Sequence, residues 1–328
     1  MSDTNVVVIT GASSGIGRAT ALELAKQGAI LFLVARRQEA LDSLAQDCTA
    51  LGATPRVFAL DVTDEEAVKN VAKAAQEEFG RIDVWINNAG VSLFGRFDEL
   101  PSKDIRRLIE INLFGYLYGA QAVLPYFKQQ GFGTLVNVSS IVGIVGQPYT
   151  VPYSVSKSAI RGLSLSLAQE LANEKHIHVC TVYPAVIDTP IFNQAGNLYG
   201  KKIQAPKPRI KANKVATTIA DLIDHPKNEV VVGGQGKVAR LARLLAPSLF
   251  DKKFRESIAD GHFYDAPQEP TLGNLYEPQP QYAQVSGGWK SEDEPDFMLP
   301  NWLIGTSLAV VAGLIIGLSR NKWFIVAI

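Results

Sequence analysis

The sequence predicts an α/β protein built on a doubly wound parallel sheet. Short apolar runs alternate with helical stretches of roughly 10–15 residues, the pattern of strands joined by crossover helices. Polar or glycine residues follow these runs, where parallel strands end. Because ligands bind at the carboxyl ends of strands in such sheets, a binding site is expected there. The length of 328 residues suggests about two domains, although single α/β domains of about 200–250 residues are common.

The first strand is predicted at residues 6–10, which are continuously apolar as in strands buried on both faces. Residues 11–17 then read Gly-Ala-Ser-Ser-Gly-Ile-Gly and lead into a helical pattern. A glycine-rich turn at a helix N-terminus presents backbone N–H groups to a pyrophosphate. The spacing is GxxxGxG rather than GxGxxG, and a tight turn without a ligand is the alternative interpretation.

The second strand, residues 30–35, ends in Arg36 and Arg37 with no carboxylate for ribose hydroxyls. Guanidinium groups pair with phosphate in a forked geometry. The pair therefore favours NADP over NAD, and Arg18 is a further candidate for phosphate binding. The alternative is that Arg36 and Arg37 merely begin a solvated helix.

Further strands are predicted at residues 56–60, 83–86, 134–138 and 229–232. Five residues lie at the carboxyl ends of predicted strands and are expected to meet at one edge of the sheet: Gly11, Arg36, Asp61, Asn87 and Ser140.

Tyr153 and Lys157 are four residues apart and share one face of a predicted helix. A nearby ammonium lowers the pKa of a phenol, so the pair can exchange a proton with a carbonyl or alcohol oxygen. A bare match to this spacing is also common on ordinary helix surfaces.

Taken together, these motifs resemble the short-chain dehydrogenase/reductase family over residues 5–235. The motifs are Thr10–Gly17, Asp61-Val62, Asn87–Gly90, Asn112, Ser139-Ser140, Tyr153-x-x-x-Lys157 and Tyr183–Thr189. The resemblance implies one Rossmann-type catalytic domain with a seven-stranded sheet, spanning residues 1–265, rather than two domains. Ala185 departs from the glycine usual in the family.

The resemblance also implies roles. Tyr153 is the expected acid-base, Lys157 tunes it and holds the nicotinamide ribose, Ser140 binds the substrate oxygen, and Asn112 holds a water. The expected NADP(H)-binding residues are Gly11, Ser13, Ser14, Gly15, Ile16, Gly17, Arg36, Arg37, Asp61, Val62, Asn88, Ala89, Gly90, Tyr153, Lys157, Pro184, Ile187 and Thr189.

Residues 190–213 are expected to form the substrate loop. Their lysines and arginines suit an acidic or lipid-borne substrate, or simply a solvated loop. Residues 236–246 form a basic amphipathic helix, which lies on a membrane surface or packs on its own domain.

The C-terminal part changes character. Residues 266–300 are rich in proline, glycine and acidic residues and are predicted to be a linker. Residues 301–328 contain an uncharged run at 302–318, ~25 Å long as a helix. It predicts a transmembrane anchor, with the catalytic domain facing the cytoplasm; an apolar helix buried in an interface is the alternative.

Composition excludes several classes. Lys and Arg balance Asp and Glu at 32 each, so no global attraction to nucleic acid is expected. Cys48 and Cys180 form no CxxC, and the four histidines have no ligand spacing, so no disulfide framework or metal site is predicted. No signal peptide precedes the first strand.

The sequence therefore predicts a membrane-bound NADP(H)-dependent oxidoreductase that interconverts a carbonyl and an alcohol, on an apolar or lipid-like substrate. A non-catalytic NADPH-binding scaffold and an NAD-linked dehydrogenase of a lipid alcohol are the alternatives. The resemblance further implies a homo-oligomer.

Overall fold

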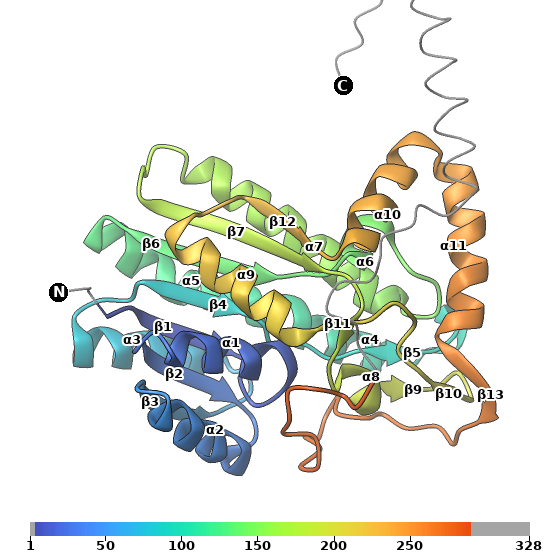
Figure 1. The fold of residues 1–328 in the computed structure, drawn as a ribbon, viewed down its shortest axis with the longest axis horizontal. Coiled ribbons are helices and arrows are strands. Elements are labelled where there is room, and N and C mark those ends of the chain that lie inside the picture. Colours follow the sequence, from blue (N-terminus) through green and yellow to red (C-terminus); the bar gives the residue numbers. More distant parts are fainter. Residues whose placement is uncertain (1–3, 290–328) are drawn as a thin grey trace, which may run out of the picture.

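A seven-stranded parallel sheet forms the centre of the computed structural model, which describes residues 4–289 (Figure 1). Its order is β12-β7-β6-β4-β1-β2-β3. The strands are β1 Val6–Thr10, β2 Ile30–Ala35, β3 Thr54–Ala59, β4 Val84–Asn87, β6 Gly133–Val138, β7 Ile177–Pro184 and β12 Glu229–Val232. The predicted Rossmann-type α/β fold is confirmed.

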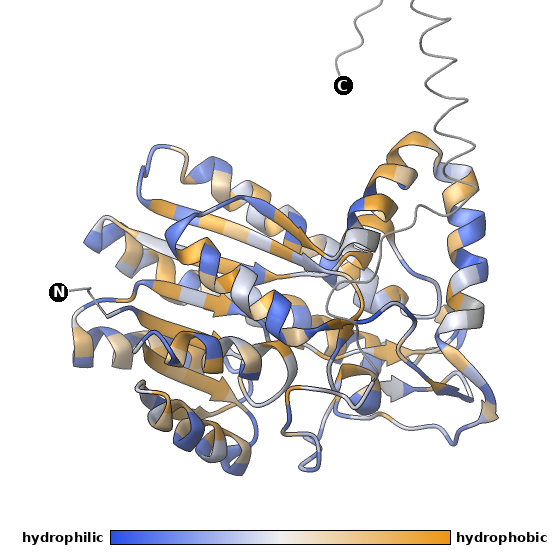
Figure 2. Cartoon of the chain, in the orientation of Figure 1, coloured by the Kyte–Doolittle hydropathy of each residue, from blue (hydrophilic) through white to orange (hydrophobic). Residues whose placement is uncertain are grey.

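Helices cover both faces of this sheet. One face carries α1 Gly15–Ala25, α2 Gln38–Ala50 and α9 Ala212–Asp224; the other carries α3 Glu65–Phe79, α5 Gly115–Gln130 and α7 Val151–Glu170. Side chains alternate along β1, so Val7 and Ile9 pack with the first group of helices while Val6 and Val8 pack with the second. Both faces of the sheet are covered at β1 and β2, which explains why these two strands are continuously apolar (Figure 2).

Residue chemistry sets the ends of several elements. Asp64 caps α3, because its carboxylate accepts a hydrogen bond from the Ala67 N–H at 3.0 Å. Gly80 ends α3 in the left-handed conformation, with φ of 71°. Between α4 Ser102–Ile109 and α5, a π-helical turn at Glu110–Phe114 carries Asn112 toward the centre of the protein.

The second half builds a layer beyond the carboxyl ends of the strands. The expected substrate loop holds α8 Ile191–Gln194, β9 Gly196–Asn197, β10 Lys201–Ile203 and β11 Ile210–Lys211. Three small two-stranded sheets join β9 to β5 Leu93–Phe94, β10 to β13 Phe263–Pro267, and β11 to β8 Ile187–Asp188.

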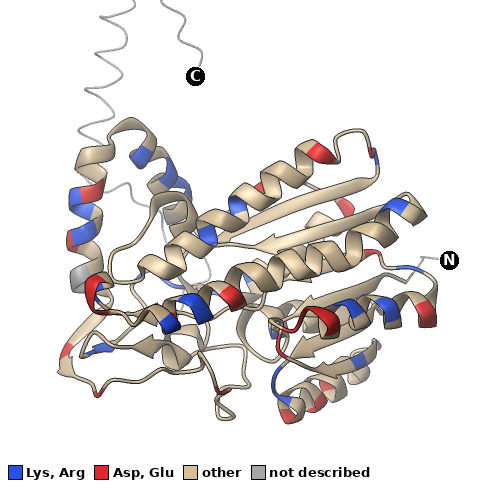
Figure 3. Cartoon of the chain, turned by 180° about the vertical axis from the view of Figure 1, so that it is seen from behind, with Lys and Arg blue, Asp and Glu red and all other residues tan. Residues whose placement is uncertain are grey.

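The basic amphipathic helix packs on its own domain. It forms α10 Gly234–Leu245, followed at once by α11 Pro247–Gly261, and the two rise beside the sheet in Figure 1. Ala242 is buried with Phe250 and with residues of α6 Val142–Val145. Lys and Arg occur along both α10 and α11 (Figure 3), and Leu244 remains 77% exposed.

Part of the predicted linker lies against the catalytic domain. Residues 268–289 run back from β13 toward α1 and α2 (Figure 1), and Leu275 within them is fully buried. Among residues 4–289, no helix is long and apolar enough to cross a bilayer. The predicted anchor at 301–328 lies outside the described residues.

Candidate active site

A cavity of about 760 Å³ opens along the carboxyl ends of the strands, within the usual size range of a cofactor pocket. Seventeen of the eighteen expected cofactor-binding residues line this cavity: Gly11, Ser13, Ser14, Gly15, Ile16, Arg36, Arg37, Asp61, Val62, Asn88, Ala89, Gly90, Tyr153, Lys157, Pro184, Ile187 and Thr189. Ser140 lines the same cavity, whereas Gly17 and Asn112 do not.

The glycine-rich turn sits between β1 and α1, where Gly11 and Gly15 have φ of +66° and +55°. A side chain at Gly17 would place its Cβ 2.2 Å from the Gly11 carbonyl oxygen, so this glycine serves close packing of the turn. The Asn88 side chain donates to the carbonyl oxygens of Thr10 and Gly11, both at 3.1 Å. These bonds hold the turn against the end of β4.

Arg36 and Arg37 line the cavity at the end of β2. The Arg37 guanidinium donates to the Ser13 hydroxyl at 2.9 Å, which links the pair to the glycine-rich turn. Burial lowers the pKa of both guanidinium groups, yet arginine remains charged at neutral pH. The arrangement offers positive charge beside backbone N–H groups, a donor set that suits the phosphates of a dinucleotide.

Arg18 does not join this pair. It is turned toward α2, where its guanidinium lies 2.6 Å from the Asp47 carboxylate and 3.2 Å from the Ala40 carbonyl oxygen. The sequence-based suggestion that Arg18 assists phosphate binding is not supported, because Arg18 does not line the cavity.

Asp61 lies at the carboxyl end of β3 and is held by Thr63 and Arg107. Burial alone would raise the pKa of Asp61, but hydrogen bonds from Thr63 and Arg107 hold that pKa below its usual value. Arg107 also donates to the Thr63 hydroxyl at 3.0 Å. Sequence reasoning missed Arg107, because only the fold brings α4 beside the end of β3.

Ser140, Tyr153 and Lys157 meet deeper in the cavity. Tyr153 and Lys157 come from α7, and Ser140 follows β6. Burial raises the pKa of Tyr153 to about 12, although a hydrogen bond with the Ser140 hydroxyl acts in the opposite direction. Burial also lowers the pKa of Lys157 to about 7. Two hydroxyls and an amine are thus buried together in one place.

The position of the Lys157 amine differs from the sequence-based expectation. Its Nζ donates to the Val138 carbonyl oxygen at 2.9 Å and to the Tyr116 hydroxyl at 3.2 Å, and it lies 5.7 Å from the centre of the Tyr153 ring. Burial lowers the pKa of the Lys157 amine and so disfavours its charged form. Burial is also the largest influence on the Tyr153 phenol, so the pKa of Tyr153 is raised rather than lowered. Tyr116, on α5, gave no signal in the sequence.

Asn112 is fully buried in the π-helical turn. Its Oδ1 accepts from the Val91 N–H at 2.8 Å, and its Nδ2 donates to the Val91 carbonyl at 2.9 Å and to the Ser156 hydroxyl at 3.2 Å. Asn112 therefore ties α7 to the loop after β4, behind the wall of the cavity that Gly90 forms.

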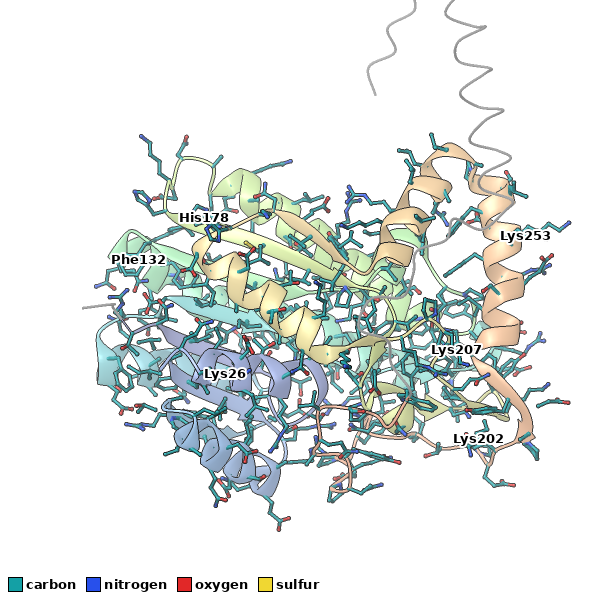
Figure 4. All side chains as sticks on the ribbon, viewed as in Figure 1. Lys26, Phe132, His178, Lys202, Lys207 and Lys253 are labelled. Carbon is teal, nitrogen blue, oxygen red and sulfur yellow. The ribbon has the colours of Figure 1, made fainter. Side chains whose placement is uncertain are left out.

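The far end of the cavity is apolar and lies between α6 and the α10–α11 pair. Its walls include Val142, Val145, Val238, Ala239, Ala242, Phe250, Phe254 and Ile258. Lys207 on the expected substrate loop and Lys253 on α11 also line the cavity; both side chains are labelled in Figure 4. The sequence indicated the loop, but it gave no sign that α11 supplies a wall.

His262 is a further wall residue that sequence reasoning treated as structural or surface. It is 3% exposed, and burial lowers its pKa to about 4, so its imidazole is neutral at physiological pH. Its Nδ1 has no hydrogen-bond partner among the described side and main chains. Phe94 and Phe192 flank it, with ring centres 5.7 and 5.8 Å away.

The chain is similar to known oxidoreductases over most of its described length. A family model for short chain dehydrogenase matches residues 5–198. The uncharacterized oxidoreductase YxnA of Bacillus subtilis is 33% identical over 268 residues, covering 81% of this chain and 75% of the relative. The 3-oxoacyl-(acyl-carrier-protein) reductase FabG of Thermotoga maritima is 39% identical over 186 residues, covering 57% of this chain and 75% of the relative.

A solved structure agrees with these sequence matches. The alcohol dehydrogenase of the archaeon Thermococcus sibiricus, complexed with 5-hydroxy-NADP, superimposes with a TM-score of 0.63 at 30% identity. The superposition covers 70% of this chain and 96% of that enzyme. Together with the sheet order and the matched motifs, these similarities show that the chain belongs to the short-chain dehydrogenase family of oxidoreductases.

Proposed function

We propose that this protein is an NADP(H)-dependent oxidoreductase that interconverts a carbonyl and an alcohol, with Tyr153 as the acid-base. The observation that carries the proposal is that Ser140, Tyr153 and Lys157 line the same cavity as Arg36 and Arg37. One end of the cavity thus offers proton-transfer groups, and the other offers cations for a phosphate.

In the proposed reduction, the hydroxyls of Ser140 and Tyr153 donate hydrogen bonds to the substrate carbonyl oxygen. The nicotinamide cofactor supplies a hydride to the carbonyl carbon. Tyr153 delivers its proton to the oxygen as negative charge develops there. A phenol with a pKa of about 12 is protonated at neutral pH, so it is ready to act as the acid. In the reverse direction the Tyr153 oxygen takes the proton of the alcohol.

Lys157 is proposed to position Tyr153 and to bind the nicotinamide ribose. Its Nζ lies beside Gly90, where an added Cβ would be 3.6 Å away, an ordinary contact distance. Asn112 is proposed to act from behind through a water, as expected from the family resemblance.

NADP(H) is favoured over NAD(H) by the two guanidinium groups at the end of β2. They stand where an acidic residue would otherwise bind ribose hydroxyls, and a 2′-phosphate pairs well with arginine. The related alcohol dehydrogenase of Thermococcus sibiricus is complexed with 5-hydroxy-NADP, which supports the same cofactor class here.

The apolar walls contributed by α6, α10 and α11 support an apolar or lipid-like substrate. A panel of retinoid, steroid, fatty and small ketones, scored for NADPH consumption, tests this proposal. We expect turnover with at least one long apolar ketone and weaker turnover with small polar ketones. NADPH binding without turnover of any carbonyl or alcohol would instead support the non-catalytic scaffold.

We further propose that the chain is tethered to a membrane with its catalytic domain in the cytoplasm, and that it forms a homo-oligomer. The tether rests on the uncharged sequence at 302–318, which begins with Trp302 and is followed by Arg320. Exposed apolar side chains, such as Phe114 in the π-helical turn and Leu165 on α7, support association between copies.

A further inference from the structure

The segment after β13 crosses the entrance to the cofactor end of the cavity. We call residues 271–289 the strap; they lie outside the part of the chain that matches the family model. Near its start, the strap exchanges two backbone hydrogen bonds between Thr271 and Asn197, of 2.7 and 3.0 Å. Leu275 then enters the hydrophobic cluster beneath α4 and is fully buried. This first attachment fixes the strap beside the adenosine end of the site.

A second attachment holds the other end of the strap to β8. The Asp188 carboxylate accepts hydrogen bonds from the Ser286 hydroxyl at 2.6 Å, from the Gly287 N–H at 3.0 Å and from the Trp289 N–H at 3.1 Å. The Arg209 guanidinium lies 5.7 Å from the centre of the Trp289 ring, within cation–π range. The strap is therefore fixed on both sides of the cavity.

Between these attachments, main-chain carbonyls of the strap face the phosphate-binding groups. Arg36 donates to the carbonyl oxygens of Asn274 at 2.6 Å and Tyr276 at 2.8 Å. Arg37 donates to the Gln279 carbonyl at 2.7 Å, and the Gly15 N–H donates to the Gln284 carbonyl at 3.1 Å. Asn274 and Pro278 also line the cavity, so the strap forms its outer wall.

The arginines can hold the strap and a phosphate together. A guanidinium has five N–H donors, and Arg36 directs two of its nitrogens to the strap. In addition, the Asn274 Oδ1 is buried without a hydrogen-bond partner within the described chain, although its amide nitrogen donates to the Gln194 Oε1 at 3.1 Å. A hydroxyl or amino group of an adenosine could satisfy this oxygen.

We propose that the strap is part of the cofactor site, closing over the adenosine half of bound NADP(H) so that cofactor exchange requires it to lift. This inference rests on the proposed function. The middle of the strap contributes mostly exposed or half-buried side chains, so lifting it does not require the Rossmann core to open. Bound cofactor and closed strap stabilise each other through Arg36 and Arg37.

The test is the rate at which NADPH leaves the full-length protein. NADPH-loaded protein is mixed with excess NADP⁺, and the loss of bound NADPH fluorescence is followed. Leu275→Ala weakens the first attachment by removing buried apolar surface, and we expect release to accelerate on the order of tenfold. Leu51→Ala is the control, because Leu51 is 41% exposed and lies outside both the strap and the cavity; this variant should release NADPH at the wild-type rate.

Ser286→Ala weakens the second attachment without touching the core, and we expect a smaller acceleration, roughly threefold. Amide hydrogen exchange of residues 277–284 should slow when NADPH binds. NADPH release at the wild-type rate in both Leu275→Ala and Ser286→Ala would overturn the strap proposal. Tighter NADPH binding by Leu275→Ala would also overturn it, because the strap would then compete with the cofactor. Failure of the wild-type protein to bind either NADPH or NADH would refute the proposed function and the strap with it.

Discussion

Tyr153 and Lys157 illustrate how burial governs ionisation in this site. Both side chains lose their hydration, which disfavours the phenolate and the ammonium alike. The pKa of the phenol therefore rises to about 12, and that of the amine falls to about 7. Each neutral form is stabilised, so Tyr153 holds its proton until negative charge develops on a substrate oxygen.

Lys157 should give stability a measurable pH dependence. Its pKa in the folded protein is about 7, below the value of about 10.4 in an unfolded chain. Between these values the unfolded chain binds more protons, so the free energy of unfolding increases as pH rises. Tyr153 opposes this trend only as pH rises from about 10 toward 12, because its folded pKa is raised.

The measurement is urea unfolding at pH 7 to 9 for the wild-type protein and Lys157→Met. The wild-type curve of unfolding free energy against pH should be steeper, by up to ~1.4 kcal/mol per pH unit. Equal slopes for the two proteins would show that Lys157 keeps an ordinary pKa when folded.

Arg36 and Arg37 should determine the cofactor preference. Replacing both with alanine removes the charge-assisted hydrogen bonds offered to a 2′-phosphate, and we expect the NADPH dissociation constant to rise on the order of 10–100-fold. NADH provides the internal control for any loosening of the strap, which affects both cofactors. A NADPH-to-NADH affinity ratio that does not fall would contradict the assignment.

Single residues were predictable where a motif fixes them and unpredictable where only the fold brings them together. Gly11, Ser140 and Tyr153 were indicated by local spacing, and all three line one cavity. Arg107 and His262 were missed, because each reaches the site through contacts between segments far apart in the sequence. The pKa of Tyr153 was expected to fall, because spacing does not show how deeply a phenol is buried.

At the scale of elements, the β1–α1 turn depends on the absence of a side chain at Gly17. We predict that Gly17→Ala destabilises the protein by ~1–3 kcal/mol through overpacking, since its Cβ would meet the Gly11 carbonyl oxygen. The displaced turn should also bind NADPH more weakly. Denaturant unfolding and NADPH titration measure both effects.

Gly162 provides the matched control, because it lies in the interior of α7 with open space where a Cβ would stand. Gly162→Ala should stabilise the protein by up to ~1 kcal/mol through helix propensity. If the two substitutions had equal effects, close packing would not be the role of Gly17.

Continuous apolar runs in the sequence predicted most of the strands. The bounds predicted for β1, β2 and β12 are the same as those in the structure. Strand β7 was not singled out from the residues, because His178 and Thr181 interrupt its apolar pattern. The family resemblance nevertheless implied a seventh strand. The orientation of α10 was left open, since an amphipathic helix suits a membrane surface and a protein core equally well.

At the scale of the whole molecule, composition separated the catalytic domain from the C-terminal part but did not place the strap. Proline and glycine suggested a linker beginning at residue 266. In the structure, residues up to 289 bind Arg36, Asp188 and neighbouring groups, and main-chain carbonyls make several of these contacts. Such contacts carry no side-chain signature in the sequence.

The proposed tether makes a prediction about the full chain. Val311→Arg, in the middle of the apolar run, should oppose membrane insertion by about 2.5–3.5 kcal/mol. Co-sedimentation with lipid vesicles should therefore be lost in this variant and retained in Val311→Leu, while NADPH binding is unchanged in both. Equal sedimentation of the two variants would argue against insertion of this run.

The central claim is that Tyr153 transfers the proton in a reaction driven by NADP(H). The most direct measurement compares turnover and NADPH binding in Tyr153→Phe and the wild-type protein, using a carbonyl substrate from the panel. We expect turnover to fall by at least ~100-fold with the NADPH dissociation constant nearly unchanged. Turnover at the wild-type rate in Tyr153→Phe would contradict the account.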